Sequence, residues 1–269
     1  VMTFLQIQKK YKKLLRQKEK GIVKNYSKAY KELEQEVKRI YSEYEQEGQI
    51  SLDDLLRYNR LQKVDNNVAK AMTRLYTSNK TLMDRTFKTI VNDTITASTK
   101  AVDGKEELKP IKKVFNTKEL IDREVGGRKW TERMKHYSAN SAYDIQTTIR
   151  AGIERGDSYT TVCRDLKQKL GKDINNPMVI VRTESARIVE ETTYETMQEL
   201  SKQAELTKTW HTMADERVRT SHTAMEGVTV GMDEEFILPS GATCMYPHGT
   251  GIAEEDINCR CYLSYSIKK

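Results

Sequence analysis

Apolar residues recur at intervals of three, four and seven along the first hundred residues, with lysines between them. In residues 3–46 they are Phe4, Ile7, Tyr11, Leu14, Leu15, Ile22, Tyr26, Leu33, Val37, Ile40, Tyr41 and Tyr44. Because a helix turns once every 3.6 residues, this spacing predicts one long amphipathic helix. The pattern breaks at Gly48, and Ser51 is a typical N-cap for a second helix that runs to roughly Ser98. Two such helices joined by a short link predict a helical hairpin.

The pattern changes twice more along the chain. Residues 99–110 show no period, whereas three further helical stretches follow, from Gly127 to Gly156, from 157 to Gly171 and after Pro177. Near residue 206 the alternation becomes strand-like in "LTKTWHTM" and again in the closing "INCRCYLSYSI". Asp215 and Gly227 fit the start and the end of a short helix between these strands.

The predicted fold is therefore mainly α, with long amphipathic helices followed by a small C-terminal α+β module. We expect four parts in chain order. They are a basic helical hairpin or arm (1–98), a linker or excursion (99–115), a helical body (116–205) and the C-terminal module (206–269).

The uneven distribution of charge along the chain suggests what the first helix binds. Charged residues make up 32% of the 269-residue chain, and its mean hydropathy is −0.73, which suits long helices with solvated surfaces. Residues 1–40 hold 12 Lys and Arg against 4 Glu, a balance of +8, while the whole chain carries +7. Such a field favours a polyanion, of which double-stranded DNA is one, or an acidic partner surface, although a solvated helix face gives the same pattern. The candidate DNA-binding residues are Lys9, Lys10, Lys12, Lys13, Arg16, Lys18 and Lys20.

Hydropathy and cysteine content exclude two classes. No apolar run reaches about 18 residues, so we expect no membrane span. Four cysteines in a chain of this length do not form a disulfide scaffold, so we expect synthesis in a reducing cytosol.

Cys259 and Cys261 are the most unusual pair in the module, because alternate residues of a strand face one side while Arg260 faces the other. Together with His222 and Cys244 they could hold a structural zinc ion, and His248 lies in the same segment. Two packed thiols, a disulfide from Cys244 to one of the pair, and a Cys–His nucleophile are the alternatives.

Charged residues near the short helix allow structural roles as well as chemistry. Asp215 is placed to cap the helix, while Arg217 and Arg219 could form salt bridges or contact a phosphate. The acidic runs 233–235 and 254–256 read as solvated turns.

The order of residues in the module resembles the C-terminal domain of the phage Mu protein F-like and SPP1 gp7-like head morphogenesis family. In that family a Trp-bearing strand precedes "DERVR" and a His, a "D..F" pair follows, and "INCRC" closes the domain, with "RTE" on an earlier helix. The matching residues are Arg182, Glu184, Trp210, Asp215, Arg217, Arg219, His222, Gly227, Asp233, Phe236, Asn258, Cys259, Arg260 and Cys261. The resemblance extends over roughly residues 120–265.

This resemblance implies a non-enzymatic minor capsid protein of the virion, associated with the portal and acting in procapsid assembly and in DNA packaging or ejection. The implied partners are the portal protein, scaffold or capsid proteins and DNA, inside the capsid near the portal vertex. Two alternatives stay open: a zinc-dependent or Cys–His enzyme in the C-terminal module, and a helical protein–protein adaptor without DNA binding.

Overall fold

The computed structural model describes residues 3–44, 50, 53, 56, 59–102, 108–109, 111 and 115–268. These residues form two compact units, each built from separated segments of the chain. The helical unit comprises Lys18–Leu82 and Thr131–Met178, and the mixed unit comprises Val1–Gln17, Met83–Trp130 and Val179–Lys269. The four-part division predicted from the sequence follows chain order instead, and it remains a prediction.

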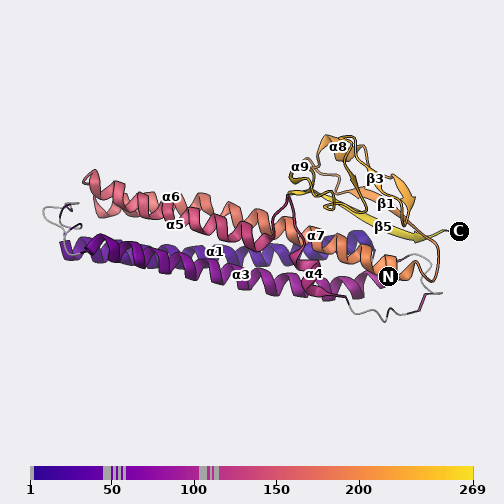
Figure 1. Ribbon diagram of the computed structural model, residues 1–269, viewed down its shortest axis with the longest axis horizontal. Helices are drawn as coiled ribbons and strands as arrows, with labels where there is room; N and C mark the ends of the chain where they lie inside the picture. The colour runs from indigo at the N-terminus through magenta and orange to yellow at the C-terminus, as the bar shows by residue number, and fades with distance from the viewer. Residues whose placement is uncertain are drawn as a thin grey trace. The chain divides into compact units, whose positions relative to one another are not determined.

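Long helices precede a small C-terminal sheet, which confirms the predicted fold class (Figure 1). The helices are α1 (Phe4–Tyr44), α3 (Arg60–Ala101), α4 (Thr117–Asp122), α5 (Trp130–Glu154), α6 (Tyr159–Asp173), α7 (Asn175–Leu200), α8 (Thr220–Thr223) and α9 (Ala253–Asp256). The strands are β1 (Leu206–Thr212), β2 (Thr229–Gly231), β3 (Phe236–Ile237), β4 (Thr243–Cys244) and β5 (Cys261–Ile267). Within the described part of the chain, no helix has the length and apolar character that crossing a bilayer requires.

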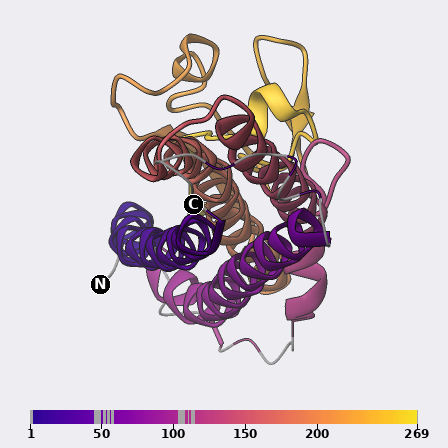
Figure 2. The same cartoon turned by 90° about the vertical axis from the view of Figure 1, so that its left-hand side faces the viewer.

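α1 and α3 run antiparallel, as the predicted hairpin requires. In the helical unit, Arg74 donates to Glu32 at 2.8 Å and Asn67 donates to Glu36 at 3.1 Å, so rising numbers on one helix meet falling numbers on the other. The core of this unit is a continuous apolar cluster contributed by α1, α3, α5 and α6. Figure 2 looks along these helices.

Two helix ends differ from the sequence prediction. α6 continues through Gly171 to Asp173, because a glycine inside a helix weakens it without ending it. α7 begins at Asn175 and holds Pro177 in its first turn, where the missing N–H of proline needs no partner. Ser158 caps α6 as expected, since its side chain accepts the N–H of Thr161.

The C-terminal module, residues 206–268, contains an antiparallel sheet in the order β2–β1–β5 and a two-stranded sheet, β3–β4. The register pairs Trp210 with Leu263 and Thr212 with Cys261. Burial alternates along β1, so Leu206, Lys208 and Trp210 face inward. β5 begins at Cys261, which leaves Cys259 in the connection before the strand rather than in it as predicted.

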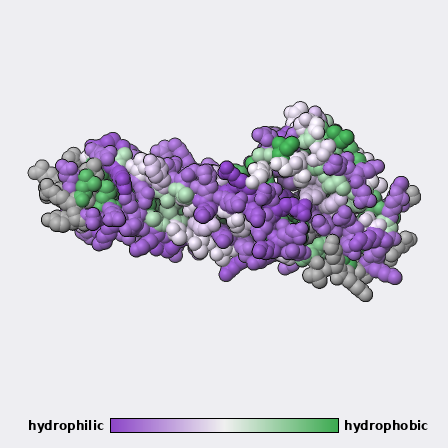
Figure 3. Space-filling view, viewed as in Figure 1, coloured by the Kyte–Doolittle hydropathy of each residue, from purple (hydrophilic) through white to green (hydrophobic). Residues whose placement is uncertain are grey.

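Surface polarity differs between the helices and the module. Figure 3 shows a mostly hydrophilic surface over the helices and several hydrophobic areas over the module. Among the exposed apolar side chains of the module are Ile237, Ile252 and Val228, which are 70%, 43% and 36% exposed.

Candidate functional site

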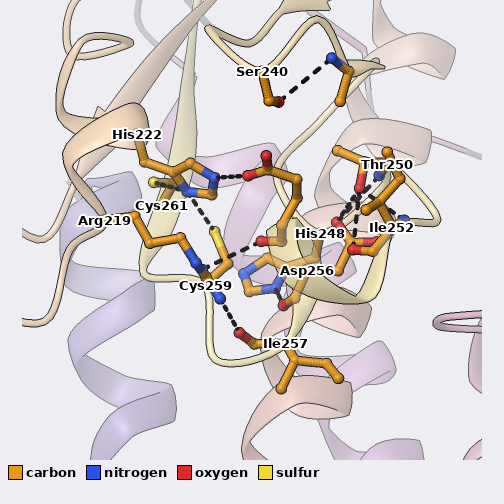
Figure 4. Close-up of polar contacts among 12 residues, drawn as sticks. Arg219, His222, Ser240, His248, Thr250, Ile252, Asp256, Ile257, Cys259 and Cys261 are labelled. Atoms are coloured by element: carbon orange, nitrogen blue, oxygen red, sulfur yellow. Dashed lines mark hydrogen bonds and ion pairs between the residues drawn. The ribbon is translucent and has the colours of Figure 1, made fainter.

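The most concentrated chemistry of the described residues lies around His222. The imidazole Nδ1 of His222 is 3.4 Å from the sulfur of Cys259 and 3.5 Å from the sulfur of Cys261 (Figure 4). All three side chains are buried, and their ligand atoms lie within 4.8 Å of one another. The sequence predicted this meeting of one histidine with both thiols, and the structure brings the three together.

The second nitrogen of His222 fixes the tautomer. Nε2 is 2.7 Å from a carboxylate oxygen of Glu255, and hydrogen bonding with Ser240 and with His222 lowers the pKa of that carboxyl group. A carboxylate only accepts hydrogen bonds, so Nε2 carries the proton. In the neutral imidazole the lone pair of Nδ1 therefore faces the two sulfurs.

Backbone geometry sets the positions of the two cysteines. Asn258 has a φ of +57°, a left-handed conformation that Asn tolerates better than most residues, and its N–H donates to Thr183 Oγ1 at 3.2 Å. Arg219 donates to the carbonyl oxygens of Glu255 and Ile257, at 3.3 and 2.6 Å, and so holds the end of α9. This turn brings the Cys259 thiol to the same side as Cys261, although Cys259 lies outside the strand.

His248 lies beside the same cluster. Its side chain is 3% exposed, and its Nδ1 is 3.1 Å from the carbonyl oxygen of Asp256 (Figure 4). Hydrogen bonding with Cys261 and burial raise the pKa of the Cys259 thiol, whereas His248 and His222 act in the opposite direction. Figure 4 shows the His248 ring on the side of Cys259. His248 also has a φ of +70°, a strained backbone for a residue with a side chain.

Cys244, the other cysteine in the zinc set predicted from the sequence, lies outside the group formed by His222, Cys259 and Cys261, and so does His248. It is buried on β4, where burial raises the pKa of its thiol to about 12. All four cysteines of the chain are free thiols in the structure.

The acidic run 254–256 corrects the expectation of a solvated turn. Glu255 and Asp256 are buried, because each has specific partners. Glu255 contacts His222, while Asp256 accepts hydrogen bonds from the N–H of Thr250 at 3.2 Å and of Gly251 at 2.8 Å. Local sequence does not reveal the burial of Glu255 and Asp256, because their partners lie earlier in the chain and the run 254–256 resembles an ordinary surface turn.

The arginines of the module serve the fold. Asp215 forms an ion pair with Arg260, whose Nε donates at 2.7 Å, and this interaction lowers the pKa of Asp215. Asp215 does not cap α8 as predicted, because this helix begins later, at Thr220. Its side chain instead accepts the N–H of Arg217 in the preceding turn. A bidentate partner across the module thus replaces the helix cap for this carboxylate.

Other motif residues fill the interior around His222. The Trp210 ring meets Phe236 edge-on at 5.1 Å and His222 at 6.1 Å between ring centroids. Gly227 has a φ of +81° and its N–H donates to the Trp210 carbonyl at 2.8 Å, so a turn that favours glycine ends beside β1. Asp233 and Arg217 are exposed.

A buried charge network on α7 was not predicted from the sequence. Arg187 donates to Glu184 at 2.9 Å, to Glu191, and to the Ile121 carbonyl at 3.1 Å, and its side chain is 1% exposed. Glu184 therefore pairs within its own helix, while Arg182 of the same motif is exposed. The spacing Glu184–Arg187–Glu191, three and four residues apart, was the available signal.

Lys208 is a second buried cation that sequence analysis missed. Its ammonium group donates to the Met245 carbonyl at 3.0 Å and lies 5.0 Å from the Tyr194 ring centroid and 5.3 Å from that of Phe236. Burial lowers its pKa to about 8. The side chain is held as a cation against two aromatic rings, which offsets part of the cost of burial.

The candidate DNA-binding residues on α1 divide into two groups. Lys9, Lys13, Arg16 and Lys20 are exposed and follow one another at intervals of four, three and four. That spacing keeps them on one face of the helix, opposite the buried residues Ile7, Tyr11 and Ile22. We call these four residues the basic stripe.

The remaining three basic residues of α1 lie elsewhere. Lys10 forms an ion pair with Asp93 at 3.0 Å. Lys12 is half-buried, and burial and the nearby Arg260 lower its pKa. Lys18 is half-buried on the side of Tyr11 and Ile22.

These features define a class: a predominantly helical chain whose small antiparallel module encloses a histidine and two thiols. Comparison with known proteins shows which family the module resembles. Residues 143–264 match the family "Phage Mu protein F like protein". The resemblance read from the sequence is confirmed, and the match begins within α5 and ends within β5.

Three relatives show how far the similarity extends. The Minor head protein GP7 of Bacillus phage SPP1 is 20% identical over 257 residues, which cover 94% of this chain and 83% of that protein. The NAD(+)--arginine ADP-ribosyltransferase EFV of Enterococcus faecalis (strain ATCC 700802 / V583) is 30% identical over 145 residues, 53% of this chain but only 29% of that protein. The uncharacterized protein YqbB of Bacillus subtilis (strain 168) is 42% identical over 48 residues, 17% of this chain and 16% of that protein. No solved structure matches the chain significantly.

Proposed function

We propose that the chain is a non-enzymatic minor head protein of a bacteriophage, located inside the capsid near the portal vertex and acting in procapsid assembly. The observation that carries this proposal is the similarity to the SPP1 minor head protein over 94% of the chain, because it includes the long helices as well as the module. The portal protein and the scaffold or capsid proteins are the partners that we propose.

The exposed apolar side chains of the module support a protein partner. Ile237, at 70% exposure, is a large apolar group on a surface where such groups cost solubility and usually mark an interaction. The adaptor alternative, a helical protein that binds only proteins, rests on the same observation.

Co-expression of the chain with the portal, scaffold and major capsid proteins of its own phage tests this role. We expect the chain in purified procapsids when the portal protein is present and a strong reduction when it is omitted. An Ile237→Asp variant should enter procapsids less well at unchanged stability, whereas a change at the exposed Thr223 to Asp should not. Equal incorporation with and without the portal protein would contradict the portal association.

The basic stripe supports nonspecific contact with double-stranded DNA during packaging or ejection. Lys9, Lys13, Arg16 and Lys20 lie on one exposed face of α1, so one side of a duplex can meet all four. Binding of this kind releases counterions, and the logarithm of the affinity falls with the logarithm of the salt concentration, with a slope of about −0.9 per neutralised phosphate.

Charge-matched variants separate the stripe from net charge. Replacing all four stripe residues with Gln should weaken DNA binding and reduce the salt slope by about 3 to 4. The control replaces four exposed lysines of other helices, Lys63, Lys70, Lys80 and Lys135, and lowers the net charge from +7 to the same +3. If both variants lose binding equally, the stripe has no special role, and binding that is insensitive to salt would contradict the DNA contact.

The enzyme alternative has one geometric argument and one stronger argument against it. Cys259, His222 and Glu255 stand in the order of a nucleophile, a base and an orienting carboxylate. However, Cys259 is 7% exposed and His222 is 2% exposed, so a substrate has no route to the sulfur. Of the arginine ADP-ribosyltransferase relative, the matched part is only 29%, and we propose no transferase activity for this chain.

A further inference from the structure

We propose that His222, Cys259, Cys261 and His248 bind one Zn²⁺ ion that holds the C-terminal module together. The proposal concerns a buried ligand set and is independent of the proposed role in the phage head. It replaces Cys244 of the sequence-predicted set with His248.

The distances around His222 fit tetrahedral zinc. With Zn–S bonds of about 2.3 Å and Zn–N bonds of about 2.0–2.1 Å, tetrahedral angles place a ligand nitrogen about 3.5 Å from a ligand sulfur. The His222 Nδ1 atom is 3.4 Å from Cys259 Sγ and 3.5 Å from Cys261 Sγ. The spacing of the three atoms thus leaves room for one ion between them.

Both histidines are arranged as zinc ligands usually are. A ligating imidazole donates its other N–H to a carboxylate or a carbonyl oxygen, which fixes the ring. His222 does so to Glu255 at 2.7 Å, and His248 does so to the Asp256 carbonyl at 3.1 Å. In the neutral imidazole this leaves a lone pair on Nδ1 of His222 and on Nε2 of His248. Figure 4 shows the His222 ring beside both thiols and the His248 ring on the side of Cys259.

The composition of the site points to a structural role for the metal. Two thiolates and two neutral imidazoles neutralise Zn²⁺ and complete its four positions, which leaves none for water or substrate. The module needs such a link, because β3 and β4 have two residues each and the remaining core is small. The four residues lie on α8, in the connection between β4 and α9, in the connection before β5 and at the start of β5, and a single ion would tie these segments together.

The first experiment measures metal in the untagged full chain. We expect one Zn²⁺ per chain after dialysis, and on replacement by Co²⁺ the visible absorption of a tetrahedral site with thiolate charge-transfer bands. Removal of the ion with a chelator should lower Tm, and added Zn²⁺ should restore it. A chain that stays free of metal after refolding with Zn²⁺ would overturn the proposal and leave two thiols hydrogen-bonded to two imidazoles.

Single substitutions test the ligand set. Cys259→Ser, Cys261→Ser, His222→Gln and His248→Gln should each lose tight binding, whereas Cys244→Ser and Cys163→Ser should retain one ion. Loss of the metal in Cys244→Ser, together with its retention in His248→Gln, would overturn the assignment of His248.

A milder pair keeps the test valid if a ligand variant fails to fold. Glu255→Gln leaves all four ligands in place but weakens the acceptor behind His222, so zinc affinity should fall roughly 10- to 100-fold at unchanged stoichiometry. Glu254→Gln is the matched control, since Glu254 is exposed and adjacent in the chain. Equal affinities in the two variants would contradict the role of His222 as a ligand.

Discussion

The helical unit and the mixed unit differ in what fills their interiors. The buried polar side chains of the helical unit, among the described residues, are Asn79, Ser141 and Asp173, within an otherwise apolar cluster. The mixed unit buries charged and titratable groups on α7 and throughout the module. They are Glu184, Arg187, Glu190, Glu191, Lys208, His222, His248, Glu255 and Asp256.

This difference shows two ways to specify a fold. An apolar helix core tolerates exchange of one aliphatic group for another of similar volume, because packing is not directional. A buried charge is stable only while its particular partner is present, because removal of the partner leaves a charge without solvent. The mixed unit should therefore be more sensitive to single polar substitutions, and the helical unit to loss of volume.

Loss of Arg187 should give the largest effect. Arg187→Gln removes the buried cation that pairs with Glu184 and one of the two arginine partners of Glu191, which keeps Arg123, so we expect the free energy of unfolding to fall by about 3–5 kcal/mol. Hydrogen exchange should accelerate in the mixed unit and change little in residues 18–82. A uniform increase over both units would mean that they unfold as one and would remove the distinction.

A cavity in the helical unit should give a somewhat smaller loss of stability, and this loss should affect the helical unit instead of the mixed unit. Leu166 is fully buried in the apolar cluster, so Leu166→Ala should cost about 3 kcal/mol by chemical denaturation. Leu166→Met is the control and should cost less than about 1.5 kcal/mol, since it nearly conserves volume. If amide hydrogen exchange in the alanine variant is faster at His222 than at Ile149, the two units do not respond as separate interiors.

The buried Lys208 makes the mixed unit sensitive to pH. Its pKa is about 8 in the folded chain against 10.5 for an ordinary lysine, so between these values the unfolded chain binds more protons. Stability of the wild type should thus rise with pH relative to Lys208→Met, by about 2 kcal/mol between pH 8 and 9.5. Paired urea titrations at both pH values measure the difference, and a constant gap between the two proteins would show that Lys208 is not shifted.

The smallest effect concerns a helix end of the helical unit. Ser158→Ala removes the side-chain acceptor for the Thr161 N–H and should lower stability by about 1 kcal/mol. Ser78→Ala, at an exposed position inside α3, should instead be neutral or slightly stabilising. Equal shifts of Tm in the two variants would show that the cap contributes nothing.

The parts of the fold that sequence analysis could predict are those set by neighbours along the chain. The apolar spacing predicted both ends of α1 and the end of α3 to within a few residues, while the predicted N-cap Ser51 lies outside the described residues. The alternation after residue 206 predicted β1 and the closing strand. The order of motif residues predicted the family resemblance. The predicted zinc set correctly placed His222, Cys259 and Cys261 together, although it also included Cys244.

What the sequence could not supply are pairings between distant residues. Glu255 looks like a surface acid until His222 is placed beside it, and Asn258 has no visible reason for its backbone until it meets Thr183 on α7. One nitrogen of the Arg187 guanidinium likewise donates to the carbonyl oxygen of Ile121, 66 positions away. Such contacts depend on the tertiary arrangement, which local periodicity does not encode.

Glu190 has a consequence for the time at which the mixed unit can form. Its carboxylate accepts the Gln8 side-chain amide at 2.5 Å and the Leu263 N–H at 3.0 Å, so one buried group joins residues near both ends of the sequence. During translation, the contacts of Glu190 with both Gln8 and Leu263 form only after residue 263 has been synthesised, because it is the last of these three residues to leave the ribosome. Without β5 the Leu263 N–H is missing, so the Glu190 carboxyl group keeps only the Gln8 amide of these two partners, and the mixed unit reaches its full set of contacts only once this strand is present.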